Sequence, residues 1–155
     1  MKRRTLLVLP LAATLVSSPA LRAGDLPAVD VYKSASCGCC GGWEAHLRAA
    51  GFTVRSHTVD DVSAMREKLG MPRDYASCHT ARIGKYLIEG HVPADDVRRL
   101  LNGRSDAIGL AAPGMPSGSP GMEFSAPQDY DVLLVTRDGK ARVFRHHPAQ
   151  KHTDG

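Results

Sequence analysis

The sequence has no excess of either charge once its first 23 residues are set aside. Four of its 20 Lys and Arg residues precede Gly24 and no Asp or Glu does, so 16 basic residues remain beside 16 acidic ones. A basic surface is what binds nucleic acid or an anionic membrane. The balanced charge therefore gives no support to either partner.

Several other features are absent. We find no internal repeat, no phosphate-binding loop, no Ser/His/Asp arrangement and no paired-carboxylate site. The main apolar run, residues 6–16, is shorter than the roughly 20 residues that a membrane-spanning helix needs. The sequence therefore predicts no stable membrane span.

The N-terminus reads as an export signal. Lys2, Arg3 and Arg4 precede the apolar run, and a stretch of small residues follows it. This pattern predicts a signal peptide over residues 1–23, cleaved after Ala23 or Ala20, and a periplasmic location. The Arg3-Arg4 pair is compatible with both the twin-arginine and the general secretory route. Residues 24–155 are then a single domain with its core at about 29–144.

Three of the four cysteines, Cys37, Cys39 and Cys40, lie within four positions, which we call the thiol turn. A predicted strand (residues 29–32) precedes them and a predicted helix (about 40–50) follows. Free N–H groups and the helix dipole favour thiolates there, and a thiolate is both a nucleophile and a soft-metal ligand. Cys37 and Cys40 have the C-x-x-C spacing of dithiol oxidoreductases, with Cys37 as nucleophile. Cys39 departs from that motif and favours a thiolate cluster around a metal.

The rest of the chain predicts an α/β fold. Gly51 ends the first helix; a strand (52–57), a helix from Asp60 or Asp61 to Leu69, two strands (75–83 and 85–89) and a helix (93–103) follow. The order β-α-β-α-β-β-α is that of a thioredoxin-like fold, with its first two strands parallel. Residues 106–128 are rich in Gly, Pro and Met and predict a long loop, neither helix nor central strand. A hairpin follows at 131–136 and 140–144.

Five residues outside the thiol turn are candidate ligands: Cys78, His79, His91, Met115 and Met122. In thioredoxin-like folds the segment before the third strand faces the dithiol, usually with a cis-proline, which this chain lacks there. Cys78 is then expected to point at the thiol turn. The alternatives are an inert core cysteine, hydrogen-bonded or capping histidines, and methionines that plug the loop onto the core. His46, His146, His147 and His152 are expected to be solvent-exposed.

Four motifs in order resemble the CopG-type copper-resistance proteins, also known as domain-of-unknown-function family 411. The motifs lie at residues 37–43, 77–81, 88–93 and 109–123. The resemblance implies a thioredoxin-like fold, export, and copper bound by Cys37, Cys39, Cys40 and Cys78 as a multinuclear Cu(I) cluster. It implies the same role, less strongly, for His79, His91, Met115 and Met122. Other periplasmic copper-resistance proteins are the implied partners.

Three functions compete on the sequence. The first is copper binding, with cycling between Cu(I) and Cu(II) if the protein is a copper oxidoreductase. The second is thiol–disulfide exchange by Cys37 and Cys40. The third is a structural module with zinc or two disulfides. Cys39 and the missing proline favour the first over the second, and the two loop methionines favour it over the third.

Overall fold

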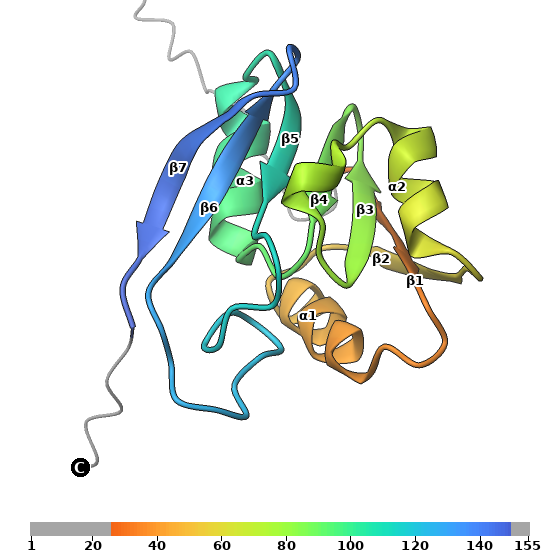
Figure 1. Ribbon diagram of the computed structural model, residues 1–155, viewed down its shortest axis with the longest axis vertical. Coiled ribbons are helices and arrows are strands. Elements are labelled where there is room, and N and C mark those ends of the chain that lie inside the picture. The colour runs from red at the N-terminus through yellow and green to blue at the C-terminus, as the bar shows by residue number, and fades with distance from the viewer. Residues whose placement is uncertain (1–25, 150–155) are drawn as a thin grey trace, which may run out of the picture.

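The computed structural model describes residues 26–149, which form one sheet with three α-helices around it (Figure 1). The expected signal peptide, residues 1–23, and His152 lie outside the described residues. The elements are β1 (Val29–Lys33), α1 (Gly38–Ala49), β2 (Val54–Thr58), α2 (Val62–Leu69), the short 3-10 helix η2 (Arg73–Tyr75), β3 (His79–Ile83), β4 (Tyr86–Glu89), α3 (Ala94–Gly103), β5 (Ala107–Ala111), β6 (Tyr130–Thr136) and β7 (Ala141–His147).

The seven strands form one sheet in the order β2-β1-β3-β4-β5-β6-β7. The β1–β2 and β4–β5 pairs are parallel, and the other neighbouring pairs are antiparallel. The predicted mixed α/β class and the parallel pairing of the first two strands are confirmed. None of the helices within residues 26–149 is both long and apolar enough to cross a membrane.

Strand β5 corrects the prediction that residues 106–128 hold no central strand. It lies inside the sheet, between β4 and β6. Its Gly109 reads as a strand breaker in the sequence, but a Cβ at this position would lie 1.7 Å from the Leu87 carbonyl oxygen of β4. The glycine therefore permits a close strand approach. Only residues 112–129, which we call the β5–β6 loop, connect the strands without regular structure.

The C-terminal ends of α2 and α3 lie where the sequence predicts them. The Asp61 carboxylate accepts a hydrogen bond from the Ala64 N–H at 2.9 Å and caps α2, and Gly70 ends it in the left-handed conformation (φ 97°). Helix α3 ends at Gly103, where the sequence predicts its end, and the next residue, Arg104, takes the left-handed position (φ 46°).

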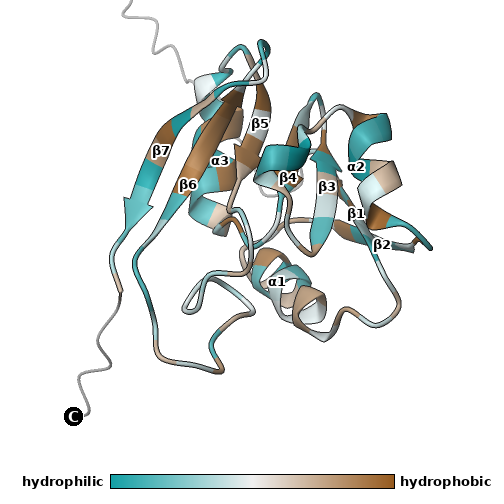
Figure 2. Ribbon diagram, in the orientation of Figure 1, coloured by the Kyte–Doolittle hydropathy of each residue, from teal (hydrophilic) through white to brown (hydrophobic). Residues whose placement is uncertain are grey.

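Apolar side chains pack on both faces of the sheet. The larger cluster includes Trp43 and Leu47 of α1 with Ile88 and Leu110 of β4 and β5. The neighbouring positions on the same strands, Leu87 and Ala111, belong to a second cluster, as the alternation of side chains along a strand requires. Figure 2 shows the resulting concentration of hydrophobic residues on β5 and β6. Helix α1 is thus packed against the larger cluster through Trp43 and Leu47.

Three histidines that were expected to be exposed have partners in the structure. His46 is half-buried, and its Nε2 accepts the Ala94 N–H at 3.0 Å. His146 and His147 are part of β7, where His147 Nε2 lies 2.6 Å from the buried Asp96 carboxylate and His146 pairs with Asp131. The prediction of solvent exposure is correct for His146, which is exposed, and wrong for His46 and His147, because their partners are distant in sequence.

Candidate metal centre

The thiol turn lies at the N-terminus of α1. Cys37 precedes the first residue of the helix, and Cys39 and Cys40 lie in its first turn. No acidic residue occupies that turn, so nothing offsets the positive end of the helix dipole. Trp43, one turn further on, is fully buried and donates its indole N–H to the Val92 carbonyl at 2.8 Å. This anchor fixes the helix, and with it the direction of the thiols.

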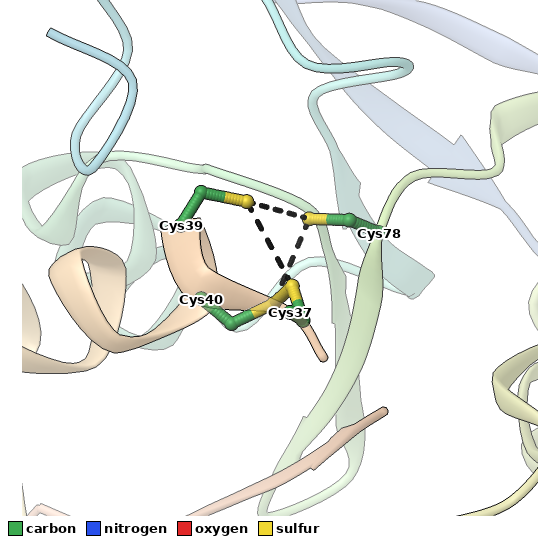
Figure 3. A group of neighbouring side chains, drawn as sticks. All are labelled: Cys37, Cys39, Cys40 and Cys78. Atoms are coloured by element: carbon green, nitrogen blue, oxygen red, sulfur yellow. Dashed lines mark hydrogen bonds between the residues drawn. A yellow bond between two sulfur atoms is a disulfide. The ribbon is translucent and has the colours of Figure 1, made fainter. Parts of the chain in front are cut away.

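Cys78 completes a group of four sulfurs (Figure 3). It projects from the start of β3 toward α1, with its Sγ 3.9 Å from Cys39 Sγ and 3.8 Å from Cys40 Sγ. All four sulfurs lie within 4.8 Å of one another. Cys78 therefore faces the thiol turn, as the sequence predicts.

Two of the four sulfurs are bonded to each other. Cys37 and Cys40 form a disulfide across a Cα–Cα distance of 5.6 Å. Cys39 and Cys78 are free thiols, and Cys39 Sγ lies 3.7 Å from Cys37 Sγ. The structure thus shows the oxidised form of the dithiol, with a third and a fourth thiol against it.

Two histidines also adjoin Cys78. The Cys78 Sγ lies 3.0 Å from His91 Nε2 and 3.3 Å from His79 Nδ1, and both rings are fully buried. The Pro120 carbonyl can only accept, so His91 Nδ1, 2.8 Å away, must carry the proton. This leaves the Nε2 lone pair directed at the sulfur, which is the arrangement of a metal-ligating histidine.

The electrostatics of this group favour neutral side chains. Burial, aided by the neighbouring His91, lowers the pKa of His79 to about 3, and burial also lowers the pKa of His91. Burial and then the proximity of Cys39 raise the pKa of Cys78 to about 12. At neutral pH both imidazoles are therefore free to donate a lone pair, and Cys78 must release a proton before it can bind a metal.

The β5–β6 loop lies against both sides of the centre. Gly121 (φ 85°) contacts the first turns of α1 closely. A Cβ on it would lie 2.6 Å from the backbone nitrogen of Trp43 and 2.9 Å from the Cys39 carbonyl oxygen. On the other side, the Gly114 N–H donates to the Ala76 carbonyl at 3.0 Å. Of the two candidate methionines in this loop, Met122 is half-buried and Met115 is 53% exposed.

Two charged residues beside Cys78, Arg66 and Glu89, were not predicted. Arg66 Nε lies 2.8 Å from Glu89 Oε1, and the two side chains are 4% and 0% exposed. One signal was available in the sequence. Arg66 lies four positions after Val62 and three before Leu69, so it is a charge on the face of α2 that carries its apolar residues.

Comparison with known proteins identifies the family. A family model described as "Protein of unknown function, DUF411" matches residues 75–122. Two solved structures, "Copper resistance protein copG- Form 2" and "Form 1", are 47% and 46% identical to this chain. They cover 79% and 80% of it and 98% and 99% of their own length, each with a TM-score of 0.74. The chain belongs to the CopG-type copper-resistance family. A search of curated proteins finds no match. The CopG structures match over almost their whole length, so the similarity is not confined to the short segment of the family model.

Proposed function

We propose that this chain is an exported protein that binds Cu(I) through Cys37, Cys39, Cys40 and Cys78, as a multinuclear thiolate cluster, in copper resistance or homeostasis. The observation that carries the proposal is the convergence of four sulfurs within 4.8 Å of one another. The two similar CopG structures are copper resistance proteins by name, which supports copper as the metal.

The donor set suits this metal. Thiolate and thioether are soft ligands that select Cu(I), and imidazole also binds copper. Four sulfurs and two imidazoles around Cys78 are more donors than one Cu(I) requires. A thiolate can bridge two metal ions, so the short distances between the sulfurs favour several ions over one.

The Cys37–Cys40 disulfide must be reduced before all four sulfurs can bind. The reduced dithiol can in turn pass two electrons to copper: two thiolates that form the disulfide release two electrons, which is the number that converts two Cu(II) ions into two Cu(I) ions. The disulfide beside two free thiols supports this redox coupling. On this proposal, a turnover of that kind would make the protein a copper oxidoreductase.

His91 and His79 serve as nitrogen ligands, and at least one of Met115 and Met122 approaches the copper from the β5–β6 loop, which acts as a lid. The fold is thioredoxin-like, supported by the element order from β1 to α3. Residues 1–23 direct export to the periplasm, where residues 24–155 act as one domain beside other copper-resistance proteins.

Thiol–disulfide exchange is the second candidate function. It is favoured by the disulfide between Cys37 and Cys40 at a helix N-terminus. Cys40 is fully buried and Cys37 only partly, so Cys37 is the sulfur that an attacking thiol can reach. In this function Cys37 is the nucleophile and Cys40 the resolving thiol.

Metal analysis and X-ray absorption on protein purified anaerobically from the periplasm test the proposal. We expect more than one copper per chain with a mostly sulfur shell.

The Cys39→Ser variant separates the two functions, because it keeps the Cys37/Cys40 dithiol and removes one cluster ligand. We expect it to lose copper and retain dithiol reduction. Stoichiometric zinc without copper, or unchanged copper retention in Cys39→Ser, would contradict the copper cluster.

A further inference from the structure

The segment that carries Cys78 has no regular structure of its own. Residues 76–78 lie between η2 and β3, and Ser77 makes an isolated bridge to Gly114. No proline restricts this segment. The position of the Cys78 sulfur must therefore be set by contacts from elsewhere in the chain.

The buried ion pair supplies those contacts. One oxygen of Glu89, Oε1, accepts both the Arg66 Nε–H at 2.8 Å and the Ser77 backbone N–H at 2.7 Å. The other side of the guanidinium, Nη2, donates to the Ser77 carbonyl at 2.7 Å. Both backbone groups of Ser77 are thus held by one pair of side chains, directly before Cys78.

The end of β4 also positions His91, which contacts the Cys78 sulfur. Glu89 is followed by Gly90, which packs so tightly that a Cβ on it would lie 2.5 Å from Ser77 Oγ. Two positions after Glu89, His91 Nε2 reaches the Cys78 sulfur at 3.0 Å. The end of β4 therefore fixes Cys78 from both sides, through Glu89 on its backbone and through His91 on its sulfur.

We propose that Arg66 and Glu89 are positioning residues that clamp the backbone of Ser77. They thereby hold the Cys78 sulfur close enough to the sulfurs of the thiol turn for all of them to bind the same metal cluster. The inference rests on the proposed copper function and adds to it two residues that touch no metal. Stability alone does not account for the pair. Replacing a buried ion pair with apolar residues of similar volume is often neutral or stabilising, since the desolvation of two charges offsets their attraction.

The test is the double variant Arg66→Met with Glu89→Leu, which keeps the apolar volume and removes the clamp. We expect its apo melting temperature to stay near that of the wild type, and its Cu(I) retention against a competing chelator to fall about 10- to 100-fold, as for residues that orient ligands. In the reduced apo protein, alkylation of Cys78 should become several-fold faster while that of Cys39 stays unchanged. The matched control is Arg73→Met with Glu67→Leu, which removes an exposed ion pair from the same part of the fold.

Arg66→Lys is the second variant and keeps the proposal testable if the double variant does not fold. Lysine preserves the charge but lacks the planar guanidinium group, whose separate N–H donors reach Glu89 and the Ser77 carbonyl at the same time. We expect an intermediate loss of copper retention and an intermediate gain in Cys78 alkylation. A Cys78 alkylation rate equal to the wild type in the folded variants overturns the clamp, whatever the copper result. If the wild type itself binds no copper, the proposed function fails, and the alkylation rates still decide whether the clamp exists.

Discussion

The two sides of the metal centre are constructed from different parts of the chain. On the helix side, Cys37, Cys39 and Cys40 come from one turn of backbone. On the strand side, Cys78 precedes β3 and His91 follows β4, so these neighbours lie 3.0 Å apart although 13 positions separate them. The helix side contains the disulfide and the strand side contains the fully buried rings.

The donor atoms on the helix side are positioned by local backbone structure, whereas those on the strand side are positioned by tertiary contacts. The helix-side thiols keep their mutual spacing as long as the first turn of α1 exists. The strand-side donors keep theirs only while the sheet, the buried ion pair and the β5–β6 loop are all in place. We therefore expect changes on the strand side to affect copper retention through geometry, and changes on the helix side through the loss of a donor.

The largest effect is expected for Cys78→Ser. Cys78 is the one residue shared by the four-sulfur group and the histidine group. Even residues that only orient a ligand cost about 10- to 100-fold in metal affinity, so loss of this shared ligand should weaken Cu(I) retention by more than about 100-fold. Chelator competition measures it, with the apo melting temperature as the control for folding. A loss of less than threefold would mean that the helix side binds copper alone.

The alkylation of Cys78 should depend steeply on pH. The thiolate is the reactive form, and the pKa of Cys78 is raised to about 12. Between pH 7 and 9 its rate should thus rise about tenfold per pH unit without a plateau. In denaturant, where a thiol has its ordinary pKa of about 8.5, the curve should flatten. Mass spectrometry of the apo protein with its Cys37–Cys40 disulfide intact measures both, and a plateau near pH 8.5 in the folded chain would contradict a buried, proton-bearing Cys78.

Gly121→Ala tests whether the loop must lie directly on α1. Gly121 and Gly114 both have positive φ, but an added Cβ clashes with backbone only at Gly121 and meets nothing within 4 Å at Gly114. We expect Gly121→Ala to lower the free energy of unfolding by about 1–3 kcal/mol beyond the loss in Gly114→Ala, because of overpacking. Copper should also exchange faster. Equal denaturation curves for the two variants would show that the loop adjusts without cost.

The smallest effects are expected for the loop methionines. Met→Leu approximately keeps volume and apolarity, so a packing role should cost less than about 1.5 kcal/mol at each position. Met122, which is half-buried, should affect Cu(I) retention by a few-fold, and Met115, 53% exposed, should affect it less. Chelator competition on the two single variants separates them. A lowered apo melting temperature with unchanged copper retention would identify both as ordinary packing residues.

The helix side of the centre could be predicted from sequence because its signals are local. The spacing of Cys37 and Cys40 can be read within four positions. The same holds elsewhere in the fold for the ends of α2, which are marked by Asp61 and Gly70. What the sequence did not predict depends on partners far along the chain. Gly109 suits a central strand because β4 leaves no space for a side chain at that position. The buried charge of Arg66 is explained by its hydrogen bonds to Glu89 and to the Ser77 carbonyl.

Cys78 also determines how the two donor groups fill. The four-sulfur group and the Cys78–His79–His91 group have this one sulfur in common. Two sites that share a ligand atom are thermodynamically linked: an ion bound on one side changes the charge and the free lone pairs that the other side receives. The copper content of the chain is then not a sum of independent affinities. Titration should instead give a curve whose steepness, or whose second step, measures the coupling free energy transmitted through a single atom.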